Sequence, residues 1–156
     1  MKIEVSIESK LWKDCGDLSA FCHIASKEIV KEIQPFYAKS LEGEISVLFT
    51  DDFHMQKLNA QWRNKNKPTN VLSFPSKNLK IGEMPGKVLG DIVFAFETIK
   101  FEALEQNKIF SEHLYHLFIH GFLHLLGFNH AIESEANQME AIETKILGHL
   151  NIKNPY

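Results

Sequence analysis

The sequence has few of the residues that mark secreted or membrane proteins. Its 156 residues include two cysteines, Cys15 and Cys22, too few for a disulfide framework and spaced unlike a paired thiolate metal site. No stretch approaches the roughly 18 to 20 apolar residues of a membrane span, and residues 1–12 alternate polar and apolar side chains. We predict a cytoplasmic protein without membrane contacts, with both cysteines as buried free thiols on one side of a helix.

Tracts rich in proline, glycine or serine are also missing, and nothing repeats along the chain. A composition of 44% hydrophobic and 24% charged residues suits one core, with about two thirds of the unfolded surface buried at this length. Because no segment resembles a linker, the sequence predicts a single domain over residues 1–156.

The net charge of −3 argues weakly against a nucleic-acid partner, but the charge is unevenly distributed. Residues 57–87 contain seven basic side chains and one acidic side chain, so this segment carries +6 and the rest of the chain −9. Such a segment can attract a phosphate backbone, although a solvated loop often has the same composition.

Hydrophobic periodicity predicts an α+β fold. Apolar residues recur at intervals of two in segments typical of strands, and at intervals of three and four in amphipathic helices. In residues 2–8 this alternation places Ile7 on a buried face. The predicted strands are residues 2–8, 44–50, 71–74 and 88–96, the last two forming a hairpin-like pair. The predicted helices are residues 17–34, 51–62, 97–106, 111–126 and 134–148, with Ser111 and Ser134 as caps of the last two.

Three histidines stand out in residues 120–130. In a helix, His120 and His124 lie one turn apart on one face, with Cβ atoms about 5 to 6 Å apart. Gly127 can adopt the left-handed conformation that ends a helix, so the chain can turn back and bring His130 to the same point. Three imidazoles with a fourth position left to water are typical of a catalytic zinc site. We predict that these histidines bind one Zn²⁺ ion.

This spacing resembles the metzincin protease signature, in which a glutamate directly after the first histidine serves as general base. Gly121 occupies that position, so the base is missing and peptide hydrolysis is disfavoured. We interpret the other histidines as surface or hydrogen-bonded residues; they are His23, His54, His113, His116 and His149.

Four groups of residues, spread over most of the chain, together indicate a known family. They are His120-Gly121-x-Leu123-His124-Leu125-x-Gly127-Phe128-x-His130, Leu58-Asn59 with Arg63, Pro68-Thr69-x-Val71-Leu72-Ser73-Phe74-Pro75, and Gly90-Asp91-Ile92. Together they resemble the YbeY family, bacterial endoribonucleases specific for single-stranded RNA that act in ribosomal RNA maturation and ribosome quality control.

The resemblance implies a small mixed four-stranded sheet flanked by helices, with a zincin-like metal-binding helix. It assigns zinc to His120, His124 and His130, and catalysis to His120 and Arg63. The implied partners are single-stranded RNA, ribosomal RNA and ribosomal particles. The predicted domain is then a metal-dependent endoribonuclease.

Arg63 also suits a phosphate on physical grounds, because its planar guanidinium offers two parallel hydrogen bonds and stays charged. Lys65 and Lys67 would add RNA binding that weakens with salt. Our leading hypothesis is that the ion polarises a phosphoryl oxygen or supplies hydroxide, while Arg63 stabilises the negative charge of the transition state. Trp62 and Phe74 are able to stack on unpaired bases, but we predict that both pack in the core.

Two positions depart from the family pattern, Asn70 and Asn129, where the family usually has aspartate. An amide can still donate and accept hydrogen bonds, but it cannot serve as a general base. Ser73, Asp91 and Glu135 are candidates for orienting a ligand histidine or a substrate group, although such residues at strand and helix ends often serve as caps alone.

Two alternatives remain open. A ribosome assembly factor could use the metal to hold the end of the chain in place, without catalysis. A metalloprotease is the second alternative, and cleavage of an unfolded protein that depends on His120 would support it despite Gly121.

Overall fold

Four strands form a mixed sheet in the computed structural model, which describes residues 1–156. The strands are β1 (Lys2–Ile7), β2 (Glu44–Thr50), β3 (Val71–Pro75) and β4 (Val88–Ala95), in the order β1-β2-β4-β3. β1, β2 and β4 run parallel, whereas β3 pairs antiparallel with β4, as predicted. The sheet therefore has two open edges, β1 on one side and β3 on the other.

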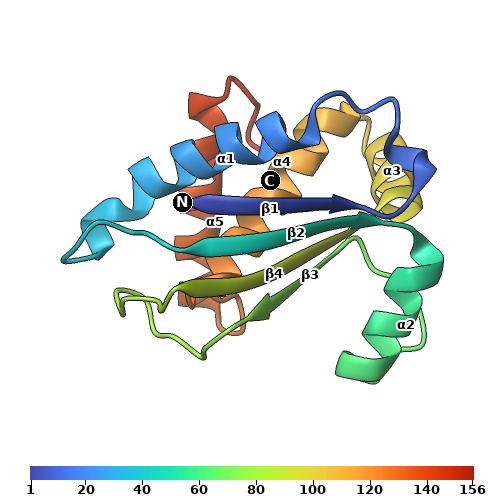
Figure 1. Cartoon of the computed structure of the whole chain (residues 1–156). Helices are drawn as coiled ribbons and strands as arrows, with labels where there is room; N and C mark the ends of the chain where they lie inside the picture. Colours follow the sequence, from blue (N-terminus) through green and yellow to red (C-terminus); the bar gives the residue numbers. More distant parts are fainter.

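Five helices surround the sheet, most of them on one face (Figure 1). The helices are α1 (Leu18–Ile33), α2 (Asp52–Arg63), α3 (Phe96–Glu105), α4 (Phe110–Leu125) and α5 (Glu133–His149). Two short 3₁₀ helices, η1 (Lys10–Trp12) and η2 (Gln34–Phe36), precede and follow α1. The predicted α+β class, with a small mixed sheet flanked by helices, is confirmed.

The core is divided between the two faces of the sheet. The main core contains 29 buried residues, most of them from α1, α4, α5 and the strands that face these helices. A second group, Met55, Leu72, Val93 and Ala95, lies under α2. Successive side chains of a strand point to opposite faces, so β4 places Phe94 in the main core and its two neighbours in the other. β4 is therefore apolar almost throughout.

α4 is the central helix of the molecule. Nine of its 16 residues are buried, and it contacts β3, β4, α1, α3 and α5. Packing on so many sides leaves little freedom to rotate or slide, since protein interiors are packed as closely as organic crystals. The polar side chains on its remaining face are therefore held in fixed positions.

The helix starts predicted from serine caps are wrong. α4 begins at Phe110, before Ser111, because the Phe110 ring packs 6.0 Å from Trp12 and draws the chain into the helix earlier. α5 begins at Glu133, so Ser134 lies inside the first turn. A negative charge at that position favours the start of a helix through the helix dipole.

Two predictions about burial also need correction. Cys22 is buried in α1 as predicted, but Cys15 precedes that helix and is only half-buried; both thiols are free. Ile7 is 56% exposed at the end of β1, because the helices cover only the earlier part of this edge strand. None of the helices combines the length and apolar character needed to cross a membrane.

Candidate metal centre

Three histidines converge at one end of α4, as their spacing predicts. The Nε2 atoms of His120 and His124, one turn apart on the helix, are separated by 2.9 Å. His130 follows in the loop before α5, with its ring centroid 5.3 Å from that of His120. One possible ligand atom of each histidine lies within 4.8 Å of the others. The three residues could therefore hold one metal ion.

The turn after α4 brings His130 back towards the helix. Gly127 has a φ of 95°, in the left-handed region, and a Cβ at this position would overlap the carbonyl group of Leu79 in the β3–β4 connection. Only glycine meets both conditions. The Phe128 amide donates to the Leu123 carbonyl, 3.1 Å away, and so closes the helix end. The predicted helix stop is confirmed, and the β3–β4 connection packs directly on it.

Hydrogen bonds at the Nδ1 atoms fix the tautomers of two of these histidines. The Phe128 carbonyl can only accept, so His124 Nδ1, 2.9 Å away, must donate. His120 Nδ1 donates in the same way to Glu143 Oε2 on α5, at 2.6 Å. In the neutral rings, both Nε2 atoms then carry lone pairs. Such partners commonly orient histidines that bind metals.

Glu143 is a fully buried carboxylate with several hydrogen-bond donors. Besides His120, it accepts from the Tyr156 hydroxyl and from His116 Nε2, the latter at 3.4 Å. Burial alone would raise the pKa of this carboxyl, but the hydrogen bonds from His116, His120 and Tyr156 outweigh burial and lower the pKa to about 2. Glu143 is therefore negatively charged beside His120 at neutral pH.

The arrangement suits a bound cation. Burial, followed by the neighbouring His120 and His130, lowers the pKa of His124 to about 4, so this imidazole is neutral at pH 7. Two lone pairs directed at each other across 2.9 Å repel, and a cation between them removes the repulsion. Neutral imidazoles are also a preferred donor set of transition-metal ions. The histidines therefore fit a metal ion.

The histidines line a cleft of about 870 Å³. Arg63, the last residue of α2, lines the same cleft, so the structure brings it together with the predicted metal ligands. The other residues that line it are Trp62, Thr69, Asn70, Val71, Leu72, Ser73, Phe74, Pro75, Asn78, Leu79, His116, Leu117, Gly127, Phe128, Asn129 and Tyr156. The edge strand β3 thus forms one wall of the cleft.

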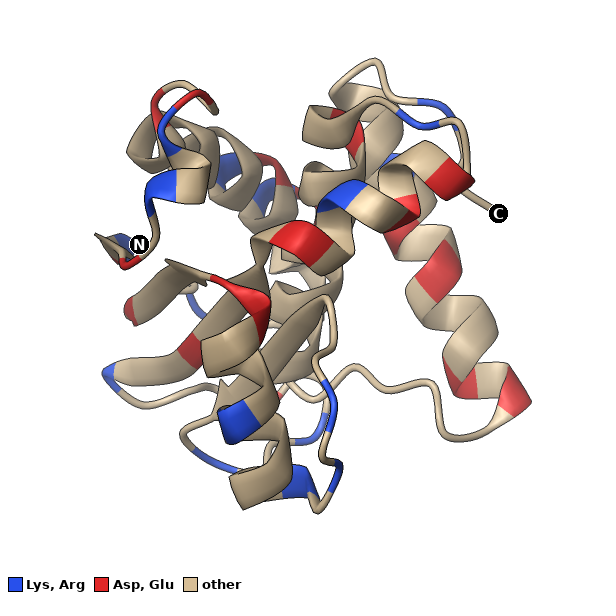
Figure 2. Cartoon of the chain, turned by 90° about the vertical axis from the view of Figure 1, so that its right-hand side faces the viewer, with Lys and Arg blue, Asp and Glu red and all other residues tan.

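Of the seven basic residues in 57–87, only Arg63 lines the cleft. Figure 2 shows basic residues on α2 and on loops at the same end of the molecule, and acidic residues along α5. Lys65 and Lys67 are exposed in the loop after α2 and do not line the cleft. Their predicted contacts therefore require a ligand that extends beyond the cleft.

Trp62 does not pack in the core, contrary to the prediction. It is 63% exposed, because the last turn of α2 extends beyond the small group of apolar residues under that helix. Its ring lies 6.2 Å from that of Phe74, which is half-buried on β3. Both aromatic rings line the cleft.

Gly121 occupies the position of the metzincin general base but faces the sheet. A Cβ there would lie 2.9 Å from the Ser73 hydroxyl and 3.1 Å from a methyl group of Ile92. The Ser73 hydroxyl also donates to the Gly121 carbonyl at 2.9 Å. No carboxylate side chain would fit between α4 and the strands. The close packing agrees with the prediction that peptide hydrolysis is disfavoured.

Comparison with known proteins agrees with this geometry. The family model described as "Endoribonuclease YbeY" matches residues 16–151. The chain belongs to the YbeY family. Relatives named "Endoribonuclease YbeY" include one from Bartonella bacilliformis, 47% identical over 100% of this chain and 97% of its own length. Another, from Agrobacterium fabrum, is 46% identical over 100% of this chain and 95% of its own length.

The fold is also similar to the solution structure of a Thermotoga maritima protein. The TM-score is 0.61 at 21% sequence identity, covering 96% of this chain and 91% of the other. At this identity the likeness concerns the fold alone.

Asn70, one of the two residues that differ from the YbeY pattern, has a neighbour that suits an amide better than a carboxylate. The Asn70 amide donates to both carboxylate oxygens of Glu102, at 2.9 and 3.1 Å. His113 Nε2 binds the same carboxylate at 2.9 Å. An aspartate at position 70 would face Glu102 with a like charge, whereas asparagine donates to it. At the second position, the Asn129 side chain accepts from the His130 amide at 2.8 Å.

The sequence did not predict that Glu143 orients His120 or that Tyr156 donates to Glu143. The candidates chosen instead, Asp91 and Glu135, do not line the cleft and form no hydrogen bond with a histidine. The signal for Glu143 was its place in the predicted helix 134–148, next to the apolar residue Ile142. A carboxylate on a buried face needs partners, because an unpaired buried charge is costly.

Proposed function

We propose that this chain is a zinc-dependent endoribonuclease, a single domain that cuts single-stranded RNA in the cytoplasm during ribosomal RNA maturation and ribosome quality control. The observation that carries the proposal is that three histidine nitrogens and Arg63 meet in one cleft. Relatives that align with the whole chain at 46% and 47% identity are named as endoribonucleases, which supports the same activity.

His120, His124 and His130 would hold the zinc ion. Glu143 and the Phe128 carbonyl keep the protons of two ligands on Nδ1 and so leave Nε2 free to bind. When bound, zinc supplies a Lewis acid and a positive charge beside the scissile phosphodiester. The negative charge of Glu143 makes His120 a stronger electron donor.

Arg63 would bind and orient the phosphate. Its guanidinium is exposed in the cleft and forms no ion pair within the protein, so it is available for two parallel hydrogen bonds. The same contact becomes stronger as negative charge develops on the phosphoryl oxygens, which lowers the barrier. Lys65 and Lys67 would attract the RNA backbone outside the cleft.

Preference for single strands would come from the aromatic residues of the cleft. Trp62 and Phe74 are accessible there, and unpaired bases can stack on such rings. In a duplex the bases are stacked on one another and unavailable. The cleft therefore suits a strand whose bases are free to turn towards the protein.

No acidic side chain lines the cleft, so this chain offers no carboxylate base there. The attacking oxygen is either the RNA 2′-hydroxyl or water. Product ends distinguish the two, because attack by the 2′-hydroxyl leaves a cyclic phosphate and attack by water does not.

Cleavage of labelled RNA by protein of known metal content tests the proposal. We expect the wild type to cut single-stranded but not duplex RNA, to lose activity in a chelator and to recover it with zinc. His124→Ala should lose bound metal and activity together. His149→Ala, which changes an exposed histidine at the end of α5 outside the cleft, should lose neither.

Cleavage that persists in metal-free protein would contradict the zinc-dependent mechanism. Metal-loaded protein that binds ribosomal particles but leaves single-stranded RNA intact would favour an assembly factor instead.

A further inference from the structure

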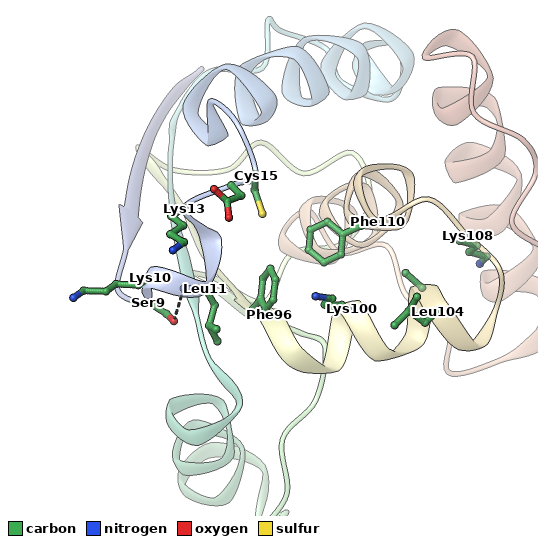
Figure 3. A pocket seen from close by; sticks show the side chains of 12 residues that line it. Ser9, Lys10, Leu11, Lys13, Cys15, Phe96, Lys100, Leu104, Lys108 and Phe110 are labelled. Atoms are coloured by element: carbon green, nitrogen blue, oxygen red, sulfur yellow. Dashed lines mark hydrogen bonds between the residues drawn. The ribbon is translucent and has the colours of Figure 1, made fainter.

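Figure 3 shows a second pocket near the start of α4. The histidines lie at the opposite end of this helix. The pocket has a volume of about 650 Å³, and its walls come from η1 and the residues after it, from α3, and from the start of α4. Phe110 of α4 lines it, and His124 lies 14 residues further along the helix, about 21 Å at 1.5 Å per residue. The pocket is therefore separate from the metal centre, and the proposed nuclease reaction does not use it.

The pocket has an apolar interior that is open to solvent. Leu11 is 44% and Leu104 70% exposed at its rim, and Phe96 and Phe110 lie half-buried between them. Cys15 also lines it. Several large apolar side chains exposed together are a feature of binding surfaces, whereas single ones are ordinary.

Basic side chains surround this apolar interior. Lys10, Lys13, Lys100 and Lys108 line the pocket with a single acidic residue, Asp14. None of the four lysines forms a salt bridge, although the chain as a whole is acidic. In Figure 3, Lys13 lies on the η1 side, Lys100 on the α3 side, and Lys10 points outward. Lys100 Nζ lies 5.8 Å from the centre of the Phe96 ring. The rim therefore presents positive charge without salt bridges on both sides of an apolar floor.

These features favour a protein segment over RNA. The rings of Phe96 and Phe110 lie 5.4 Å apart and pack on Trp12, at 5.1 and 6.0 Å. Each of these rings packs on the other and on Trp12 and is half-buried, whereas Trp62 of the cleft is 63% exposed and more open to a base. The four basic side chains of the pocket are lysines, which pair with carboxylates as well as with phosphates, so the apolar floor decides between the two kinds of ligand. Its chemistry instead complements carboxylates next to large apolar side chains.

We propose that this pocket docks an acidic segment of a partner protein. Large apolar side chains of the segment enter between Leu11 and Leu104, and flanking carboxylates pair with Lys13 and Lys100. The proposal is independent of the nuclease activity, because no pocket residue belongs to the cleft. It gives the chain a second surface through which it can be brought to a particular assembly.

Fluorescence anisotropy with the full chain tests the proposal. The probe is a labelled peptide with a central Leu-Phe pair flanked by glutamates, and the matched control peptide has glutamines in place of the glutamates. We expect the glutamate peptide to bind about tenfold more tightly, with a difference that shrinks as salt is added, because exposed charges are screened.

Charge reversal in the protein supplies the second comparison. The double variant Lys13→Glu/Lys100→Glu should bind the glutamate peptide about tenfold more weakly, since it replaces two attractions by repulsions. The matched variant Lys27→Glu/Lys31→Glu changes two exposed lysines of α1 that lie outside the pocket and should bind normally. Metal content and RNA cleavage should be unchanged in both variants.

Cysteine alkylation locates the bound peptide. Burial raises the pKa of both thiols, to about 12 for Cys22. Cys22 is fully buried and Cys15 only half-buried, so Cys15 is the thiol that an alkylating reagent reaches in the folded protein. The glutamate peptide should slow alkylation of Cys15.

Equal affinity for the two peptides, or alkylation of Cys15 that the peptide does not slow, would overturn the proposal. Protection of Cys15 by oligouridylate at the same affinity would assign the pocket to RNA. If the chain self-associates in sedimentation without peptide and Cys15 is then protected from alkylation, the pocket would be assigned to a second copy of the chain.

Discussion

Replacing Glu143 with glutamine tests how the buried carboxylate supports the metal centre. The side chain is fully buried, and its pKa is about 2 against an ordinary 4.5, although burial alone would raise it. A pKa lowered from 4.5 to about 2 corresponds to about 3 kcal/mol of stabilisation of the charged form. Glutamine keeps one acceptor for His120 but directs an amide N–H₂ towards His116 or Tyr156. We therefore expect Glu143→Gln to lower the free energy of unfolding by about 3 kcal/mol and zinc affinity by about 10- to 100-fold.

Two measurements separate these effects. Competition with a chromogenic chelator gives zinc affinity, and urea denaturation of the metal-free protein gives stability. Because the pKa of Glu143 is lower in the folded state, its contribution is complete above pH 4.5 and is lost as the pH falls towards 2. The wild type should lose stability across this range, and Glu143→Gln should lose less. Glu140→Gln, one turn earlier on α5, is the matched control. A Glu143→Gln protein with wild-type zinc affinity would refute the orienting role.

Two further substitutions test local packing. Asn70→Asp should destabilise the protein by about 1 to 3 kcal/mol in urea denaturation, because it sets a carboxylate against Glu102. Adding Glu102→Gln should restore much of the loss, and a failure to restore it would contradict this explanation. Gly121→Ala should lower the thermal midpoint, because overpacking against Ser73 costs about 1 to 3 kcal/mol and the helix propensity gained is about 1 kcal/mol. A more stable Gly121→Ala variant would show that α4 can move away from the sheet.

The metal ligands could be predicted because their signal is local. His120 and His124 need only one turn of helix, and His130 needs only the turn that Gly127 permits. The four strands and five helices follow in the same way from periodicity within short segments. Arg63 was placed beside the histidines only through the resemblance to a family, since nothing near it in the sequence contains a ligand.

The remaining features depend on contacts between distant segments. Glu143 meets His120 only after α5 has packed on α4, so neither residue shows the partnership in its own segment. Trp62 shares a helical face with buried Met55, yet α2 extends beyond the apolar surface below it. Ser111 has the chemistry of a cap, but aromatic packing at Phe110 starts the helix earlier. In each case tertiary packing overrides the local preference.

The contact between Leu79 and Gly127 links the two halves of the cleft. Leu79 belongs to the connection that carries Lys77 and Lys80, and Gly127 belongs to the turn that presents His130. RNA held by those lysines would act on the same peptide units that position the third metal ligand. Any effect of bound RNA on metal affinity through this contact would be matched, by thermodynamic reciprocity, by an equal effect of the metal on RNA affinity. A single steric contact could thus make the strength of metal binding report whether substrate is present.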